Sequence, residues 1–327
     1  MSITTVFAPG KLFVIGEYAV LSGARALVAA LDAGIIVRAE RATRWNLKAL
    51  DLGIDGALDD GAADSRAVLL TRAIYAGRAE HGIETPLSIT VEGARPASRR
   101  KYGLGGSAAS VVAVLGALAS LVGEDLGSKR TRDSLFATAF RVHREHQRGR
   151  GSGADVAASV YGGWLDYSFG EGGPHIVPAA MPEDVRLAAV WSGVASDTVR
   201  AIDAFEALRA ARFRAVLDRF WDGLSSGRTE AIGEAITAYG AVLEEIGGDA
   251  EGARRIHDLV AAARAAGFAA KGSGAVGGDS AIALGFGGAD VGALHARWRA
   301  MGGEPLDVAL DGRGVRALDG RNGGSDA

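Results

Sequence analysis

A glycine- and serine-rich stretch, KYGLGGSAAS at 101–110, stands directly before the apolar run VVAVLGAL. Glycine tolerates positive φ and has no side chain, so such a loop lets several backbone N–H groups turn toward one point. The first turn of a helix adds unpaired N–H groups and the positive end of the helix dipole. The stretch therefore predicts a site for an anion such as a phosphate.

Each of the two serines in this stretch, Ser107 and Ser110, can take more than one role. Either Ser107 or Ser110 can cap the helix, or one hydroxyl can reach a phosphate or Mg²⁺. The simplest alternative to an anion site is a tight turn with a serine N-cap and nothing bound. The stretch is not a Walker A loop, because no Gly-Lys-Ser/Thr follows it.

Two charged residues elsewhere could act on a bound anion. Lys11 follows a Pro-Gly pair, where the chain is expected to turn, and by itself it fits a solvated surface lysine equally well. Asp155 is the one acid in the segment 149–164, and it follows Arg148 and Arg150. A carboxylate near arginines stays ionised and can still accept a proton from a substrate hydroxyl. The alternative is an acid placed at a helix start, where the dipole favours it.

A third glycine cluster, GSGAVG at 272–277, matches the dinucleotide pattern G-x-G-x-x-G. That fingerprint requires a helix directly after the glycines. The following residues, GDSAIALGF, are typical of a strand instead. We therefore do not expect a dinucleotide site of this kind.

The composition narrows the class of protein. Of 327 residues, 48% are hydrophobic and 23% are charged, which is typical of a globular chain with a sizeable core. The formal net charge of -3 argues against nucleic acid or an anionic membrane as partner. The absence of cysteine excludes disulfides, thiolate catalysis and cysteine-bound metal. Because we find neither a signal-peptide pattern nor an apolar run of about 20 residues, we expect a cytoplasmic location.

Periodicity supplies the elements that must position these residues. Apolar residues three and four apart predict helices over 64–81, 108–118, 131–147 and 290–301, and largely helical structure over 198–267. Alternation predicts strands within 86–93, 162–169, 185–193 and 268–286. The opening of the chain is interpreted as short strands broken by Pro9, Gly10, Gly16 and Gly23, and the acidic stretch 47–64 as a surface excursion.

These elements predict an α+β protein with two lobes. The first 180 residues or so mix strands and helices, and the remainder is mainly helical with a late strand pair. We place a first unit at 1–185 and a second at 186–318, with a disordered tail at 319–327.

Four segments together resemble a known family. They are APGKLFVIGEYAVL, KYGLGGSAAS, GSGADVAASVYGG and KGSGAVGGDSAIAL, in this order and at these separations. They resemble the motifs of the GHMP kinase superfamily, and the resemblance covers almost the whole chain. It implies a GHMP kinase fold, with an N-terminal ATP-binding lobe like ribosomal protein S5 domain 2, a C-terminal α+β lobe and an active site between them.

Within the superfamily, the chain is most similar to the phosphomevalonate kinase branch. Tyr18 stands where mevalonate kinases usually carry histidine, and a lysine precedes the glycine loop. The resemblance implies ATP- and Mg²⁺-dependent phosphorylation of (R)-5-phosphomevalonate to 5-diphosphomevalonate in the mevalonate route to isoprenoids. The alternatives are mevalonate kinase, another small-molecule kinase of the superfamily, or a non-catalytic ligand sensor. The implied partner is this small molecule, with no nucleic acid or membrane, and the chain would be a monomer or homodimer.

The resemblance also implies the roles of individual residues. Lys11 would contact the transferred phosphoryl group, and Asp155 would orient Lys11 and the acceptor. The ATP phosphates would be held by Lys101, Gly103, Leu104, Gly105, Gly106, Ser107, Ala108 and Ala109. The acceptor would be held by Tyr18, Arg144, Ser152, Gly153, Ser192, Gly274 and Gly277, with Lys271 adding local charge. Mg²⁺ would be held by Ser107 and Glu145.

Two positions depart from the family pattern. Gly106 stands where the family usually has a serine, which removes one hydroxyl near the phosphates. Arg144 stands eleven residues before Asp155, where mevalonate kinases supply a glutamate. Because an arginine can pair with a phosphate, Arg144 is consistent with an acceptor that already carries one.

Overall fold

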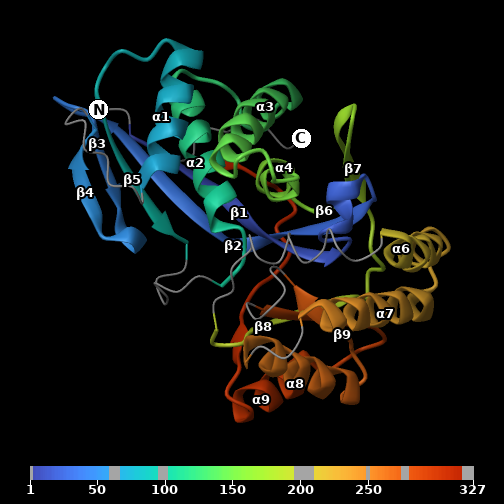
Figure 1. Cartoon of the computed structure of the whole chain (residues 1–327). Helices are drawn as coiled ribbons and strands as arrows, with labels where there is room; N and C mark the ends of the chain where they lie inside the picture. Colours follow the sequence, from blue (N-terminus) through green and yellow to red (C-terminus); the bar gives the residue numbers. More distant parts are fainter. Residues whose placement is uncertain are drawn as a thin grey trace, which may run out of the picture.

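Two separate sheets organise the chain, one in each lobe (Figure 1). The computed structural model describes residues 3–58, 67–94, 102–194, 210–247, 251–273 and 280–318. The larger sheet has the strand order β12-β1-β2-β5-β3-β4, and β6 pairs with both β2 and β7. All of its pairs are antiparallel except β3 with β5. Its strands are β1 (Thr4–Ile15), β2 (Ala26–Arg41), β3 (Asn46–Ala49), β4 (Ile54–Ala57), β5 (Leu87–Gly93), β6 (Trp164–Gly170), β7 (Gly173–Ala179) and β12 (Arg316–Ala317).

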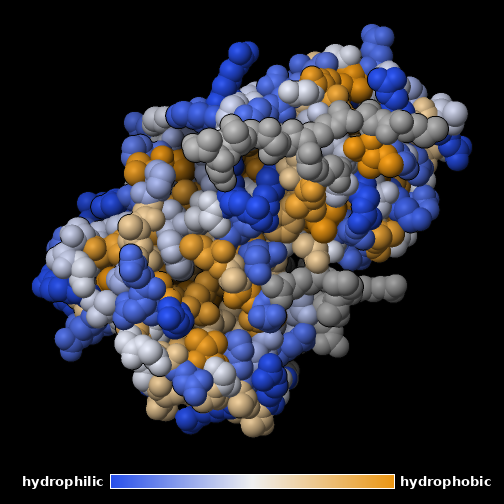
Figure 2. All heavy atoms as spheres, turned by 180° about the vertical axis from the view of Figure 1, so that it is seen from behind, coloured by the Kyte–Doolittle hydropathy of each residue, from blue (hydrophilic) through white to orange (hydrophobic). Residues whose placement is uncertain are grey.

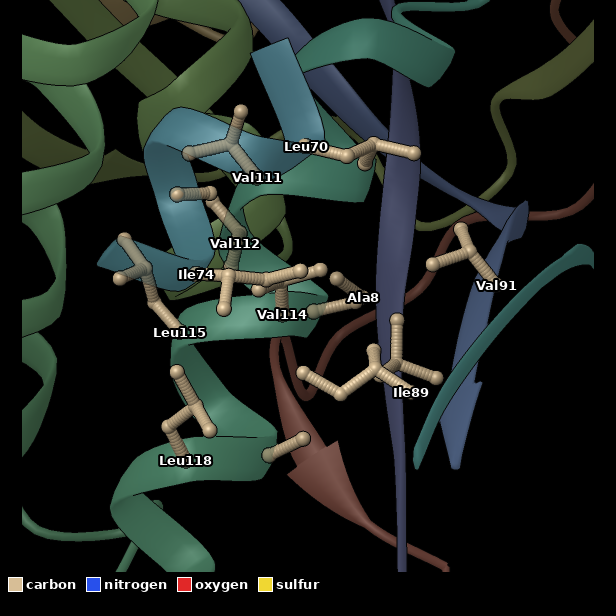
Figure 3. Close-up of a cluster of buried hydrophobic side chains, with 14 of the residues drawn as sticks. Ala8, Leu70, Ile74, Ile89, Val91, Val111, Val112, Val114, Leu115 and Leu118 are labelled. Carbon is tan, nitrogen blue, oxygen red and sulfur yellow. The ribbon is translucent and has the colours of Figure 1, made fainter. Parts of the chain in front are cut away.

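Helices cover one face of this sheet (Figure 1). They are α1 (Val68–His81), α2 (Gly106–Leu121), α3 (Lys129–His146) and α4 (Ala154–Tyr161); the short 3-10 helices are η1 (Ala19–Ser22) and η2 (Leu50–Leu52). The central helix α2 is apolar on nearly every side, which is typical of a helix buried all round. Its Val111 and Leu115 lie in one buried cluster with Ile74 of α1 and Ile89 of β5 (Figure 3). This packing fixes the start of α2 relative to β1.

The second lobe has an antiparallel sheet of order β11-β8-β10-β9. Its elements are α6 (Ala210–Ser225), α7 (Thr229–Gly247), α8 (Glu251–Ala265), α9 (Val291–Ala300), β8 (Arg186–Trp191), β9 (Ala269–Ser273), β10 (Ser280–Gly285) and β11 (Glu304–Leu306). Strand side chains alternate between faces, so Ala281 and Ala283 belong to the cluster with α8 and α9. Ile282 and Leu284 belong to the cluster with α6, α7 and Leu12 of the first lobe. One face of this sheet therefore packs toward the other lobe.

Polar and apolar residues alternate on the face of the molecule seen from behind (Figure 2). Seen from behind, hydrophilic residues cover much of the molecule, and apolar residues gather in patches between them (Figure 2). Among the described residues, no helix is both long enough and apolar enough to cross a membrane. Where the structure describes them, the helices and strands expected from periodicity are confirmed within a few residues, for example α1, α3 and α9; residues 198–209 of the expected helical stretch lie outside the described residues.

The opening of the chain differs from the prediction of short, interrupted strands. β1 runs on through Pro9 and Gly10, and its register with β2 shifts between these two residues. Proline cannot donate to the strand ladder, and an irregularity of this kind accommodates it without ending the strand. The acidic stretch is also more ordered than a surface excursion, because β3 and β4 pair over 46–57. Residues 59–64 lie outside the described part of the chain.

The last described segment returns to the first lobe. Arg316 and Ala317 pair with β1, and the Ala309 backbone N–H donates to Asp32 Oδ1 at 2.8 Å. The C-terminal end of the second predicted unit, 186–318, therefore lies against the first lobe. A two-residue strand has no periodicity to detect, which is why the sequence does not show this return. The predicted tail at 319–327 lies outside the described residues.

Candidate active site

Helix α2 begins directly at the glycine loop. Its N-cap is Gly105, which has a φ of 77° and receives no side-chain cap. Ser110 Oγ donates to Gly106 O at 2.7 Å, and Ser107 Oγ lies 3.1 Å from His143 Nε2. The serine-capped turn, the alternative to an anion site, is thus not formed. The unpaired N–H groups of a first helical turn and the positive dipole end remain available to an anion here.

Lys11 packs against the glycine loop and is 8% exposed, so it is not a solvated surface lysine. Its Nζ donates to Gly103 O at 3.3 Å, and its backbone N–H donates to Leu104 O at 2.8 Å. This approach needs two glycines. A Cβ at Gly105 would lie 2.8 Å from Lys11 Cγ, and one at Gly10 would lie 2.6 Å from Leu104 O. The glycines therefore bring the lysine and the loop together.

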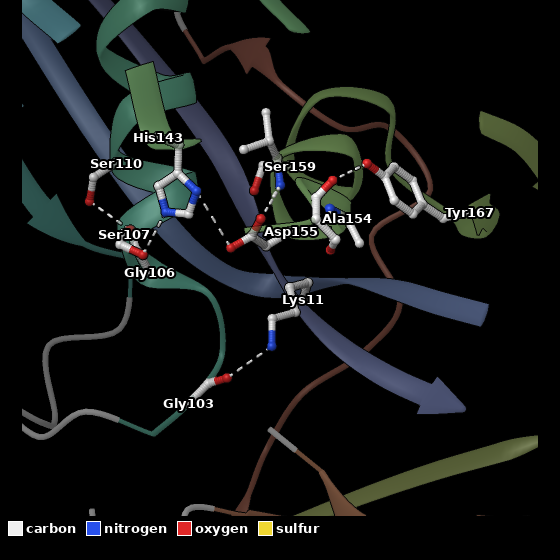
Figure 4. Close-up of polar contacts among 12 residues, drawn as sticks. Lys11, Gly103, Gly106, Ser107, Ser110, His143, Ala154, Asp155, Ser159 and Tyr167 are labelled. Carbon is white, nitrogen blue, oxygen red and sulfur yellow. Dashed lines mark hydrogen bonds and ion pairs between the residues drawn. The ribbon is translucent and has the colours of Figure 1, made fainter. Parts of the chain in front are cut away.

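A second helix start lies at the same place. Asp155 is in the first turn of α4, where its Oδ1 accepts a hydrogen bond from the Val156 backbone N–H at 2.9 Å. The N-cap Gly153 has a φ of 82°, and a Cβ there would lie 2.3 Å from Phe140 Cδ2. The Asp155 side chain is 19% exposed, so it is partly shielded but open to a ligand. Figure 4 shows Lys11, Ser107 and Asp155 around one region, from three different elements.

His143 of α3 joins these two helix starts. Its Nε2 faces Ser107 Oγ, and its Nδ1 lies 3.8 Å from Asp155 Oδ2 (Figure 4). Sequence reasoning missed this residue. A signal was available, because His143 continues the apolar positions Leu135 and Ala139 at helical spacing, and the structure shows all three buried.

Glu145 lies on another side of the same helix. Two residues beyond His143 correspond to about 200° around a helix axis. Glu145 is 58% exposed, and its Oε1 lies 3.8 Å from Arg141 Nη1. The structure therefore turns Glu145 away from Ser107, with which the sequence had grouped it as a metal ligand.

Arg144 and Ser152, which precede α4 in the chain, contact aromatic residues. The Arg144 guanidinium stacks over the Phe169 ring, 4.5 Å from its centroid. The Ser152 carbonyl accepts a hydrogen bond from the Tyr167 hydroxyl. Burial raises the pKa of Tyr167, and the negative charge of Asp155 raises it further, so the hydroxyl stays protonated and donates. The Tyr167 hydrogen bond fixes the turn before α4, and both Asp155 and Arg144 act electrostatically on the Tyr167 hydroxyl.

A buried ion pair connects the lobes near Tyr18. Lys271 of β9 contacts Glu17 Oε1, and the Tyr239 hydroxyl donates to the Glu17 backbone carbonyl at 2.6 Å. Burial lowers the pKa of Lys271, which the Glu17 carboxylate opposes. Tyr18 itself is buried and has a φ of 62°. Neither Glu17 nor its pairing with Lys271 was anticipated from the sequence, although both residues stand inside the quoted motifs.

The second lobe also contacts the residue that precedes the glycine loop. The Tyr102 hydroxyl donates to Glu304 Oε1 at 2.8 Å, and Ser280 Oγ donates to the Tyr102 carbonyl at 2.7 Å. The Tyr102 ring meets Trp191 edge to face, with centroids 5.6 Å apart. Ser192 follows Trp191 and is fully buried, and its Oγ accepts from the Val194 backbone N–H at 3.1 Å. Ser192 therefore lies on the second-lobe side of the site.

The remaining predicted residues divide into three groups. Ala108 and Ala109 are buried at the start of α2, and the Ala109 backbone N–H donates to Gly105 O at 3.1 Å, so Ala108 can offer its backbone N–H to a phosphate and Ala109 does not. Gly106 has open space where a Cβ would stand, so the missing serine of the family pattern is not excluded by packing. Lys101, Gly274 and Gly277 lie outside the described residues.

The chain is similar in sequence and in structure to known kinases. Residues 68–163 match the model of the GHMP kinases N terminal domain. A phosphomevalonate kinase of Streptomyces sp. (strain CL190) is 32% identical, over 93% of this chain and 97% of that protein. A mevalonate kinase of Methanothermobacter thermautotrophicus is also 32% identical, over 91% of this chain and 96% of that protein. The structure of a Streptococcus pneumoniae phosphomevalonate kinase in complex with phosphomevalonate and AMPPNP has the same fold. It is 22% identical, with a TM-score of 0.79 over 95% of this chain and 100% of that chain.

Proposed function

The chain belongs to the GHMP kinase family, and from this premise we propose that it transfers the γ-phosphoryl group of ATP to (R)-5-phosphomevalonate. The products are 5-diphosphomevalonate and ADP, which places the reaction in the mevalonate route to isoprenoids. The observation that carries the proposal is the meeting of Lys11, the start of α2 and Asp155 in one place. Phosphoryl transfer depends mainly on positioning and charge neutralisation, which these groups supply.

Lys11 and the start of α2 hold the transferred group. The bond between the γ-phosphorus and the β-phosphate oxygen breaks while a bond from the acceptor oxygen forms, and ADP leaves. Backbone N–H groups from Gly103 to Ala108 donate hydrogen bonds to the ATP phosphates, and the Lys11 ammonium stabilises negative charge on the transferred phosphoryl group. Because Lys11 is held by Gly103 O, its ammonium is oriented before substrate arrives.

The acceptor in this reaction is a phosphate oxygen. Such an oxygen is already anionic at neutral pH, so Asp155 orients Lys11 and the acceptor and little proton removal is needed. Arg144 supports this acceptor, because a guanidinium held over the Phe169 ring can pair with the phosphate that phosphomevalonate carries. Tyr18, Ser152 and Ser192 complete the acceptor side of the proposal.

Oxygen donors at the two helix starts fit Mg²⁺. Ser107 Oγ and the Asp155 carboxylate are hard oxygen ligands, whereas Glu145 points elsewhere. Within the described ranges, no group of three or more histidine or acidic side chains could hold a metal ion by itself. This suits Mg²⁺, which is commonly held by one or two protein ligands together with substrate phosphates. Bound with ATP, the ion would neutralise charge on the phosphates.

Mevalonate kinase is the second candidate, because a mevalonate kinase is as similar in sequence as the phosphomevalonate kinase. With mevalonate the acceptor is a hydroxyl, and Asp155 would then act as a base. A non-catalytic sensor is less well supported, since Lys11, Ser107 and Asp155 all stand in the site. A cytoplasmic location and a monomeric or homodimeric state stay predictions.

The deciding experiment measures ADP release from ATP and Mg²⁺ with 5-phosphomevalonate and, separately, with mevalonate. We expect turnover with 5-phosphomevalonate and little with mevalonate. Arg144→Leu should raise KM for 5-phosphomevalonate by about 10-fold or more, the loss of a charge-assisted pair. Arg141→Leu is the matched control, because Arg141 is 58% exposed on the same helix and pairs with Glu145. Turnover with mevalonate alone would refute the proposed acceptor.

A further inference from the structure

The imidazole of His143 is buried between two groups that the proposed reaction uses. The residue is 1% exposed, with Nε2 3.1 Å from Ser107 Oγ and Nδ1 3.8 Å from Asp155 Oδ2. Figure 4 shows the ring between the start of α2 and the start of α4. The reaction described above uses both neighbours of the ring but gives the ring itself no role.

The two neighbours favour one tautomer of His143. A carboxylate attracts a proton on the ring nitrogen that faces it, which here is Nδ1. Nε2 then carries a lone pair toward Ser107. Because heavy-atom positions show no protons, this tautomer is assigned from the neighbours. The Ser107 hydroxyl donates its hydrogen to Nε2 and keeps its oxygen lone pairs for a further ligand.

We propose that His143 is a positioning residue that holds the Ser107 hydroxyl with its oxygen lone pairs facing the phosphate site, as a ligand for the divalent cation bound with ATP. The inference rests on the proposed phosphotransferase function. A hydroxyl without such a partner can rotate its hydrogen toward the cation and repel it. Partners that orient a metal ligand in this way change metal affinity by about 10–100-fold.

Three substitutions separate orientation from packing. His143→Gln offers an amide oxygen that can accept the Ser107 hydrogen, whereas His143→Leu fills the space without an acceptor. His143→Asn is a further variant, because its shorter amide can face Asp155 but does not reach Ser107. Melting temperatures show which variants are folded. His143→Leu and His143→Asn both lack an acceptor for Ser107, so the test can still be made if one of the two does not fold.

The experiment measures AMPPNP binding to the full chain by calorimetry, once with Mg²⁺ and once with EDTA. In the wild-type protein Mg²⁺ should increase the affinity. His143→Leu and His143→Asn should lose about 10-fold or more of that gain, with binding in EDTA unchanged, and His143→Gln should keep most of it. Ser107→Ala should lose the same gain, and adding His143→Leu to it should lose no more, because the two residues act through one contact.

Three results would overturn the inference, and the third would also overturn the proposed function. If His143→Leu and His143→Asn lost the same AMPPNP affinity in EDTA as in Mg²⁺, Ser107 would be donating its hydrogen to a phosphate oxygen. Full retention of the Mg²⁺-dependent gain in a folded His143→Leu variant would mean that the ring only fills space. A wild-type protein that binds no AMPPNP under either condition would refute the proposed function itself, and this inference with it.

Discussion

Replacing Lys271 with methionine should destabilise the protein far more than removing an exposed lysine. Lys271 is 0% exposed, its ammonium contacts Glu17 Oε1, and it donates to Gly272 O at 2.9 Å. The other carboxylate oxygen, Glu17 Oε2, is buried without a hydrogen-bond partner among the described residues. Lys271→Met therefore leaves a buried charge without compensation, which costs about 3–5 kcal/mol.

This cost converts into a measurable change in melting temperature. With an unfolding entropy of about 2.1 cal/mol/K per residue over 327 residues, it corresponds to a decrease of about 4–7 °C. Lys129→Met is the control, because Lys129 is 88% exposed and pairs with Asp133 on the surface of α3. An exposed pair contributes below about 1 kcal/mol, so the control should melt within about 1.5 °C of the wild type.

A double variant isolates the pairing from the loss of each side chain. Glu17→Gln with Lys271→Met removes both charges, so it should recover most of the stability that Lys271→Met loses. For Glu17→Gln by itself, the loss of stability relative to the wild type should become smaller as pH rises. Burial lowers the pKa of Lys271, so the folded protein releases that proton at a lower pH than the unfolded chain does.

Differential scanning calorimetry of these variants at neutral and alkaline pH is the assay. The reasoning would be refuted if Lys271→Met melted as the wild type does, or if the double variant lost the sum of the two single losses. Either result would mean that Glu17 finds compensation other than the Lys271 ammonium.

Three further predictions concern the helix starts. Asp155→Asn should lower kcat by about 100-fold or more with little change in melting temperature, and near-normal ADP release would contradict its role. Gly105→Ala should lower the free energy of unfolding by about 1–3 kcal/mol, because φ is 77° and the new Cβ would lie 2.8 Å from Lys11 Cγ. Gly106→Ala, which meets open space, should leave stability unchanged in the same urea titration, and equal losses would exclude this explanation. Tyr167→Phe should reduce the alkaline loss of stability. Burial raises the pKa of Tyr167 above its unfolded value of about 10, so the stability it contributes is present below pH 10 or so and lost above it. An unchanged stability profile between about pH 9 and 11 would contradict this.

Local features of the site could be predicted from the sequence. The glycine loop at 101–110 by itself predicts a helix start and an anion site, because glycine permits a backbone conformation or a close approach that other residues do not. The roles of Lys11 and Asp155 follow from the resemblance to the family, since each residue alone also fits a purely structural role. The apolar stripe after the loop likewise predicted α2, and with it a helix start at the phosphate site.

Partners that come from distant parts of the chain could not be predicted. His143 meets Ser107 across 36 residues, and Lys271 meets Glu17 across 254. Helical spacing indicates that one side of α3 is buried, but not which helix start it faces. The same limit explains why Glu145 was grouped with Ser107, and why the return of the chain to β1 near residue 316 was not foreseen.

The sequence by itself therefore determined the family motifs, the phosphate loop and the residue types that can move a phosphoryl group. The tertiary structure decided which of those side chains are buried, which way they point and which charges compensate one another. The physical reason is that glycine conformation and helical period are properties of a short segment. The environment of Lys11 or His143, by contrast, arises when sheets and helices far apart in sequence pack together.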